Sequence, residues 1–181
     1  MRLFIGIPLP KEIRQAVYGT MNRETNRAIM RLTPRDNYHI TVAFLGEQPA
    51  DRIPGIQAAM KQIAESSSQE SLRCAGLRTF PAHTAPRCIV TPVTDGKDAV
   101  IAMMCSVKRL LQVPMRTRGV TPHVTLARMR RGARVDTAEL RRRVSPQLHI
   151  SYVLSEIVLY RSYLEQKGAR YEPLWTIRLR T

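Results

Sequence analysis

The sequence predicts an α+β fold built on antiparallel sheets. Segments with strand-like alternation and segments with helical spacing follow one another along the 181 residues. The strand segments are half polar, whereas the strands of a buried parallel sheet are continuously apolar. Two near-copies of one pentapeptide, HITVA at 39–43 and HVTLA at 123–127, fall on strands in different halves of the chain. We therefore expect two similar lobes, each contributing one strand to a shared cleft.

The first half of the chain shows clear element signals. Alternating apolar residues closed by two prolines predict a strand over Arg2–Pro8. Helical spacing of apolar residues predicts a helix from Lys11 to about Met30. Turn residues at 33–37 then lead into a β-branched and aromatic strand over Tyr38–Leu45. Asp51 is expected to cap a helix that runs to about Ala64.

The second half continues the alternation of strands and helices. Its apolar patterns and turn residues predict, in order, strands over Leu72–Phe80 and Arg87–Val93, a helix from Asp95 to about Leu111, a strand over Val120–Met129, a short helix over Thr137–Val144, and a closing pair of strands over Leu148–Tyr160 and Tyr171–Leu179. A chain of this length is expected to form a single domain, residues 1–181, whose two lobes share a core.

The charge of the chain favours a polyanionic partner. Lys and Arg number 29 against 14 Asp and Glu, which gives a net charge of +15. Arginine predominates, and its planar guanidinium binds phosphate in a bidentate manner. Nucleic acid is favoured over membrane because no basic amphipathic helix stands out. The alternative is a basic surface that serves solubility alone.

Several classes of protein are disfavoured. The three cysteines lack C-x-x-C spacing, which argues against a disulfide framework or zinc site and for a reducing compartment, so we expect a cytoplasmic protein. No apolar run approaches the ~18 residues that a membrane span requires. The opening residues predict a buried strand rather than a signal peptide. The G-x-x-x-x-G-K-[ST] and G-x-G-x-x-G phosphate loops are both absent.

The two pentapeptides contain the candidate catalytic residues. Alternation on a strand places His39 and Thr41 on one face, and His123 and Thr125 likewise, with apolar neighbours on the other. Two imidazoles that face one cleft can act as general base and general acid on opposite sides of a reacting centre. The two hydroxyls could donate to phosphate oxygens. Arg128 follows the second pentapeptide. Regular alternation along the strand does not decide whether its side chain reaches the cleft.

The histidines also allow other interpretations. A single His-x-Thr on a strand is more often an ordinary structural pair, but two copies with the same flanks are hard to obtain by chance. A two-histidine metal site lacks a carboxylate or cysteine ligand at the usual spacing, so we expect no metal. His83 and His149 lie outside the pattern, and we expect structural or surface roles for them.

The sequence resembles a known family at these same residues. The two motifs, about eighty residues apart, look like those of the 2H phosphoesterase superfamily, and the closest likeness is to the RNA 2′,3′-cyclic phosphodiesterases, also called 2′-5′ RNA ligases. The likeness covers nearly the whole chain, in the segments RLFIGIPLP (2–10), HITVAFLG (39–46), PHVTLAR (122–128), LYRS (159–162) and GARYEPL (168–174).

The resemblance implies a fold and an activity. The fold would be bilobal and pseudo-symmetric, with two antiparallel sheets flanking a central cleft and helices outside. The activity would be hydrolysis of RNA 2′,3′-cyclic phosphate ends to 2′-phosphates without metal or cofactor, on RNA that includes tRNA fragments, or on cyclic nucleotides. His123 would activate water and His39 would protonate the departing 3′-oxygen. Thr41, Thr125 and Arg128 would bind the phosphate, and a monomer is expected.

The sequence also departs from the family. Relatives commonly carry an aromatic residue where this chain has Thr91, and often another where it has Val120, which leaves Phe44 and Tyr38 as possible base contacts. Two alternatives to the cyclic phosphodiesterase remain. One is a non-catalytic RNA-binding module on the same scaffold. The other is a ligase or phosphodiesterase that acts on other 2′-5′ or cyclic nucleotides.

Overall fold

The computed structural model describes residues 1–80, 86–114, 119–166 and 168–181. Among these residues every pairing between named strands is antiparallel, and the predicted α+β class is confirmed. The helices are α1 (Lys11–Glu24), α2 (Ile53–Glu65), α3 (Lys97–Leu111) and α4 (Thr137–Val144). The strands are β1 (Arg2–Pro8), β2 (Met30–Leu32), β3 (His39–Glu47), β4 (Glu70–Ala75), β5 (Arg78–Phe80), β6 (Cys88–Asp95), β7 (His123–Met129), β8 (His149–Leu154), β9 (Glu156–Glu165) and β10 (Gly168–Arg178).

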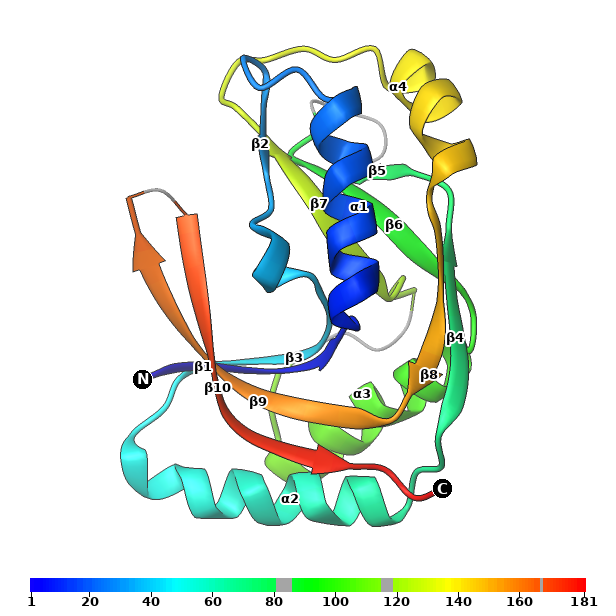
Figure 1. The fold of residues 1–181 in the computed structure, drawn as a ribbon. Coiled ribbons are helices and arrows are strands. Elements are labelled where there is room, and N and C mark those ends of the chain that lie inside the picture. Colours follow the sequence, from blue (N-terminus) through cyan, green and yellow to red (C-terminus); the bar gives the residue numbers. More distant parts are fainter. Residues whose placement is uncertain (81–85, 115–118, 167) are drawn as a thin grey trace.

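The strands form a curled sheet in the order β10-β9-β1-β3-β7-β6-β4-β8, with β2 beside β7 and β5 beside β6 (Figure 1). The two antiparallel sheets that the family resemblance implied are the two halves of this curled sheet, which meet where β3 pairs with β7, at Ile40 and Val124. Segments cross between the halves: β2 pairs with β7, while β9 and β10 join β1. Each half of the sheet is therefore completed by a segment from the other end of the chain.

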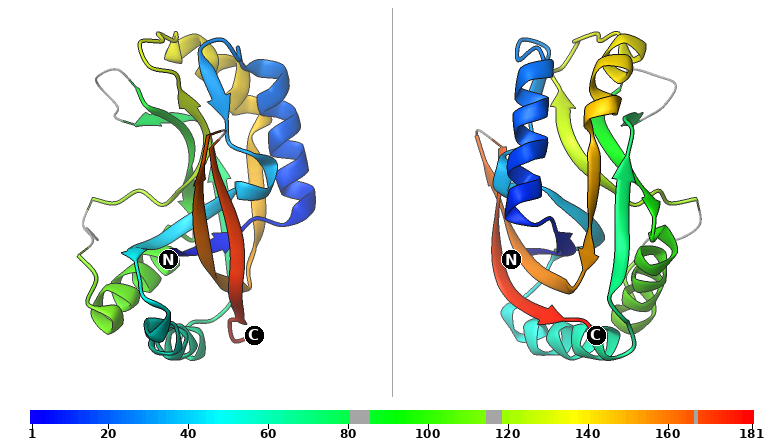
Figure 2. Two further views of the ribbon diagram at one scale, coloured as in Figure 1. Left: turned by 90° about the vertical axis from the view of Figure 1, so that its left-hand side faces the viewer. Right: turned by 45° about the vertical axis from the view of Figure 1, so that its right-hand side comes forward.

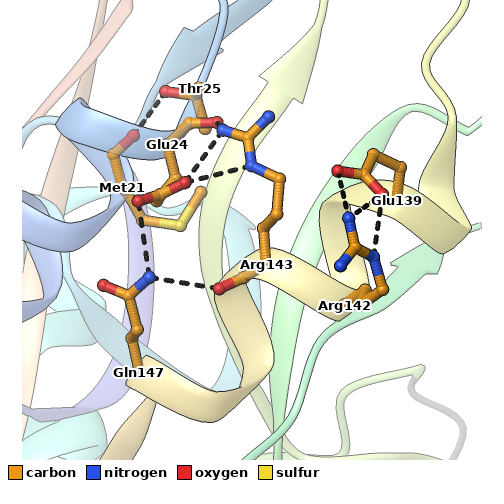
Figure 3. A network of polar contacts seen from close by, with 7 residues as sticks. All are labelled: Met21, Glu24, Thr25, Glu139, Arg142, Arg143 and Gln147. Atoms are coloured by element: carbon orange, nitrogen blue, oxygen red, sulfur yellow. Dashed lines mark hydrogen bonds and ion pairs between the residues drawn. The ribbon is translucent and has the colours of Figure 1, made fainter.

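The helices lie in two pairs, α1 with α4 in the upper part of the view and α2 with α3 in the lower part (Figures 1 and 2). Helix α2 contacts α3, β9 and β10, and α1 contacts α4. Arg143 links α4 to α1, because its Nη2 and Nε donate to the Glu24 carboxylate of α1 at 2.8 and 3.2 Å (Figure 3). Gln147 donates to the same carboxylate at 3.4 Å. None of the helices in the described ranges has the length and hydropathy that a bilayer crossing requires.

Some predicted elements have the expected bounds and others do not. The strand Arg2–Pro8 and the helix Thr137–Val144 are confirmed as predicted. Helix α1 ends at Glu24 rather than near Met30, because the following residues turn and extend into β2 beside β7. Asp51 does not cap α2, since it lies in a short 3₁₀ turn and the helix begins at Ile53 without a side-chain cap.

Two predicted strands are each divided in the structure. The segment 72–80 forms β4 and β5, which Gly76 separates by a turn with φ +74°. The segment 148–160 forms β8 and β9, separated at Ser155. Strand β8 pairs with β4 in one half of the sheet, whereas β9 pairs with β1 and β10 in the other. The break therefore occurs where the chain passes from one half to the other, and the closing hairpin β9–β10 is confirmed.

The apolar residues of both pentapeptides lie in the core. Ile40, Val42, Val124 and Leu126 are all at most 1% exposed. Burying such a side chain contributes about 1.5–3 kcal/mol. The core therefore holds both strands in place from the side opposite to their polar residues.

Candidate active site

The two pentapeptides lie side by side at the junction of β3 and β7. Ile40 pairs with Val124, and alternation places the flanking histidines and threonines on the opposite face of both strands. His39, Thr41, His123 and Thr125 are all half-buried and line one cleft of about 500 Å³. The structure thus brings together all four polar residues of the two predicted pairs.

The two imidazoles are oriented in the same way. Nδ1 of His39 donates to the backbone carbonyl of Asn37 at 2.7 Å, and Nδ1 of His123 donates to that of Thr121 at 2.7 Å. Because a carbonyl oxygen only accepts, Nδ1 carries the proton in each neutral ring and Nε2 is the basic nitrogen. Nε2 of His39 accepts from the Thr41 hydroxyl at 3.0 Å. In each ring Nε2 is therefore the nitrogen that can exchange a proton with a ligand, and at His39 it is bound by the Thr41 hydroxyl in this structure.

Burial lowers the pKa of both histidines. For His39, burial and a smaller effect of charge on His123 together lower the pKa to about 4, against the opposing effect of the Asn37 carbonyl. Burial likewise lowers the pKa of His123, against the Thr121 carbonyl. Both rings are consequently neutral at pH 7 in the free protein. A bound anion would favour the protonated form and raise these pKa values.

A β-bulge interrupts each pentapeptide at its fourth residue. On β3, Thr41 and Ala43 pair with consecutive residues of β1, so Val42 is the extra residue. On β7, Thr125 and Ala127 pair with consecutive residues of β6, so Leu126 is extra. A bulge shifts the alternation of the strand by one residue. The residue that follows each pentapeptide therefore turns toward the cleft.

Phe44 and Arg128 occupy these two equivalent positions. Both are exposed and both line the cleft. The bulge at Leu126 explains how Arg128 reaches the site, which regular alternation left open. Nη1 of Arg128 contacts Sγ of Cys88 at 3.5 Å, and in the strand register Arg128 lies opposite Arg31 of β2, which also lines the cleft. Two guanidinium groups thus give this part of the cleft a positive potential.

The prediction of a base contact at Tyr38 is wrong. Its side chain is 1% exposed and packs in the core, because the residue before His39 faces away from the cleft. Phe44 is 68% exposed and remains a candidate. Thr91 is fully buried, so the departure from the family at this position lies in the core and removes no aromatic side chain from the cleft.

Among the cleft-lining residues that sequence reasoning missed, three lie beside residues of the predicted site. The ring of Phe80 lies 5.0 Å from that of His123, and the ring of Tyr171 meets that of His39 edge-on at 5.3 Å. Arg31 is the third. They come from β5, β10 and β2, and no local pattern singles them out, because only the sheet topology brings them to the motifs. His149 is exposed, and His83 lies outside the described residues.

Two residues from neighbouring segments fix the position of His39. Asn37, whose carbonyl accepts from the ring, also donates from Nδ2 to the carbonyl of Ala169 at 2.6 Å, which ties β10 to the same turn. On the other side, a Cβ at Gly6 would lie 3.1 Å from Cδ2 of His39 and 3.3 Å from the carbonyl of Ile40. A side chain at Gly6 would therefore require the ring of His39 or the backbone of β3 to shift by a few tenths of an ångström.

No group of three or more His, Cys, Asp or Glu side chains in the described part of the chain is arranged to hold a metal ion. The polar groups that line the cleft instead include two imidazoles, two guanidinium groups and the hydroxyls of Thr41 and Thr125. Such a set fits a phosphate: the guanidinium and hydroxyl groups donate to its oxygens, and the imidazoles accept or donate a proton beside it.

Comparison with known proteins gives consistent matches. The model of a family described as "LigT like Phosphoesterase" matches residues 7–90. A Geobacillus stearothermophilus protein named RNA 2′,3′-cyclic phosphodiesterase is 31% identical over 94% of this chain, which spans 55% of that protein's length. A Thermus thermophilus protein of the same name is 28% identical over 99% of this chain and 91% of its own. The crystal structure of Escherichia coli LigT with 3′-AMP has a TM-score of 0.78 at 22% identity, covering 99% of this chain and 98% of that one.

Proposed function

We propose that the chain is a LigT-like phosphoesterase and that it hydrolyses 2′,3′-cyclic phosphate ends of RNA to 2′-phosphates by acid and base catalysis with two histidines. The curated relatives carry the name of this activity. The observation that carries the proposal is the matched orientation of His39 and His123, each of which donates from Nδ1 to a backbone carbonyl and so has Nε2 as its basic nitrogen.

The phosphate would lie between the two imidazoles. Hydroxyl hydrogens of Thr41 and Thr125 and the guanidinium of Arg128 would donate to its non-bridging oxygens. Thr41 now donates to Nε2 of His39, so on binding its hydroxyl would turn to the phosphate and release that nitrogen. The net charge of +15 supports attraction of an RNA strand to this site.

The reaction would then need two proton transfers. Nε2 of His123 would take a proton from water as the water oxygen bonds to phosphorus. The bond from phosphorus to the 3′-oxygen would break, and Nε2 of His39 would give that oxygen its proton, leaving a 2′-phosphate. The low pKa of His39 in the free protein requires that the bound anion raise it before His39 can serve as the acid. This division of roles is part of the proposal.

The test is an assay with an excess of chelator. The protein is incubated with 2′,3′-cyclic AMP and with an oligonucleotide that ends in a cyclic phosphate, and products are identified as 2′- or 3′-phosphates. Formation of 2′-phosphate in chelator is the expected result. No product from either substrate would contradict the proposal, and loss of activity on chelation would point to a metal. Joining of RNA ends or cleavage of 2′-5′ linkages without this hydrolysis would favour the alternative activities.

A further inference from the structure

A second cavity continues directly from the catalytic cleft. It measures about 530 Å³, and it shares Arg31, Phe44, Arg128 and Tyr171 with the cleft of about 500 Å³. Each volume falls within the usual range for a site that holds one small ligand. Because they share walls, the two cavities form one groove with two compartments, and only the first contains the histidines.

Part of the wall of the second compartment is apolar. Phe44 of β3 and Leu164 of β9 both line it, and their side chains are 68% and 73% exposed. Large apolar side chains that remain exposed together in a groove mark a binding surface more often than a lone exposed residue does. Ser162 lies in the same wall, two residues before Leu164 and hence on the same face of β9.

Another part of the wall is cationic. Arg2, Arg31 and Arg128 line it, and among the described residues none of the three forms an ion pair. The two carboxylates in the wall already have partners: Glu47 lies 3.3 Å from the N-terminal amino group, and Glu165 lies 2.9 Å from Nε of Arg170. The charges without an ion-pair partner in this wall are therefore positive, which favours binding of an anion.

Apolar side chains next to cationic ones match a single nucleotide. The apolar side chains can contact the face of the base, and the cationic side chains can bind the anionic phosphate. The direction of the strand follows from chemistry. A cyclic phosphate closes the 3′ end of an RNA, so a strand whose end lies between the histidines continues only toward its 5′ side. The groove offers that continuation a path past Phe44 to Leu164 and Arg2.

Resting on the proposed function, we infer that the second compartment binds the penultimate nucleotide of the RNA. Its base lies on Phe44 and Leu164, and the phosphate on its 5′ side is bound by Arg2. The protein consequently distinguishes an RNA end from a cyclic mononucleotide, since the mononucleotide fills the first compartment alone.

The test compares two substrates in each of several proteins. kcat/KM is measured for a short oligonucleotide with a cyclic phosphate end and for 2′,3′-cyclic AMP, and their ratio is the readout. In the wild type we expect a ratio of roughly 10–100, from stacking of one base and one phosphate contact. Leu164→Ala and Arg2→Gln should each lower the ratio toward 1. Both side chains are exposed, so the variants should fold.

The matched control is Arg109→Gln, which removes the same charge from an exposed position on α3 outside both compartments. It should keep the wild-type ratio. A wild-type ratio near 1, or a ratio unchanged in both groove variants, overturns the inference. If neither substrate is hydrolysed, the proposed function fails instead, and the groove is tested by binding of a 3′-phosphorylated oligonucleotide. Equal affinity of wild type, Leu164→Ala and Arg2→Gln would then overturn the inference.

Discussion

Ile40 and Val124 form the residue pair that joins β3 to β7, and each stands between the histidine and the threonine of its own motif. An antiparallel register that passes through this pair sets His39 toward Thr125 and Thr41 toward His123. The buried side of the pair belongs to the core and the other side to the cleft. One contact between two apolar residues therefore aligns the four polar groups that we propose act on the substrate.

Replacing either histidine of the motifs should abolish turnover. His39→Ala and His123→Ala each remove one proton transfer, so kcat should fall by about 10²–10⁴-fold or more. RNA binding should survive, because the arginines remain. Steady-state kinetics and a binding titration measure the two effects. The control is His149→Ala, at an exposed position on β8, and normal turnover in either motif variant would contradict the proposed roles.

A methyl group at Gly6 should displace the ring of His39. The added Cβ would meet Cδ2 of that ring at 3.1 Å, and relief of the contact moves the imidazole or the backbone of β3. We expect Gly6→Ala to lower kcat at least ~10-fold, as small displacements of catalytic groups do, and to cost about 1–3 kcal/mol of unfolding free energy. A Cβ at Gly55 on α2 would meet no other atom within 4 Å, so the control Gly55→Ala should keep both kcat and the free energy of unfolding. Unchanged kcat in Gly6→Ala would show that the ring tolerates the shift.

Loss of the Asn37 side chain should loosen the turn before His39. The amide donates to the carbonyl of Ala169, and its removal leaves that partly buried carbonyl without this donor. Asn37→Ala should therefore cost about 1–3 kcal/mol of stability and reduce kcat more than substrate binding. Asn26→Ala, which breaks only a local turn bond to Ala28, is the control. Equal behaviour of the two variants in denaturation and kinetics would count against this role.

Stability should decrease as the pH falls below neutrality. The pKa of His39 is about 4 in the folded protein, whereas an unfolded chain has a histidine pKa of about 6.5. As the pH falls, the unfolded state therefore binds the proton before the folded state does. Neutral His39 contributes to the stability of the fold above pH ~6.5, and this contribution is lost as the pH falls toward 4. It amounts to at most about 3 kcal/mol. The free energy of unfolding, measured with urea at several pH values, should depend less on pH in His39→Gln than in wild type. The same pH dependence in both proteins would contradict this prediction.

Removal of Arg143 should weaken the attachment of α4 to α1 without affecting catalysis. The lost contacts are those to the Glu24 carboxylate, whose pKa is lowered by the hydrogen bond from Arg143 (Figure 3). Arg142→Ala removes the same charge but breaks only a pair with Glu139 on its own helix. Thermal unfolding should give a lower Tm for Arg143→Ala than for Arg142→Ala, with kcat unchanged in both. The same Tm for both would show that the contact between helices adds nothing.

The site could be predicted where local alternation decides it. The His-x-Thr faces follow from the period of a strand, and the structure places them as expected. Phe44 and Arg128 depend on two bulges, which arise from the pairing with β1 and β6 and leave no local signal in the sequence. Tyr38 was wrongly placed in the cleft, although the alternation that directs His39 to the cleft directs Tyr38 to the core.

The ends of elements and the outer wall of the cleft depend on tertiary structure. The helical pattern continues past Glu24, but pairing with β7 draws residues 30–32 into a strand. Phe80 and Tyr171 reach the histidines from β5 and β10, so the fold alone identifies them. A three-residue strand and a contact between distant strands carry too little sequence pattern to be recognised beforehand.

The two bulged strands have a consequence for how such a site can change. In a symmetric homodimer with a cleft on its two-fold axis, every substitution occurs twice and both sides of the cleft stay identical. Here the two equivalent positions belong to one chain and have diverged to an aromatic ring at Phe44 and a guanidinium at Arg128. One side of the cleft can therefore adapt to a base while the other keeps its charge, an asymmetry that no assembly of identical subunits could hold at its axis.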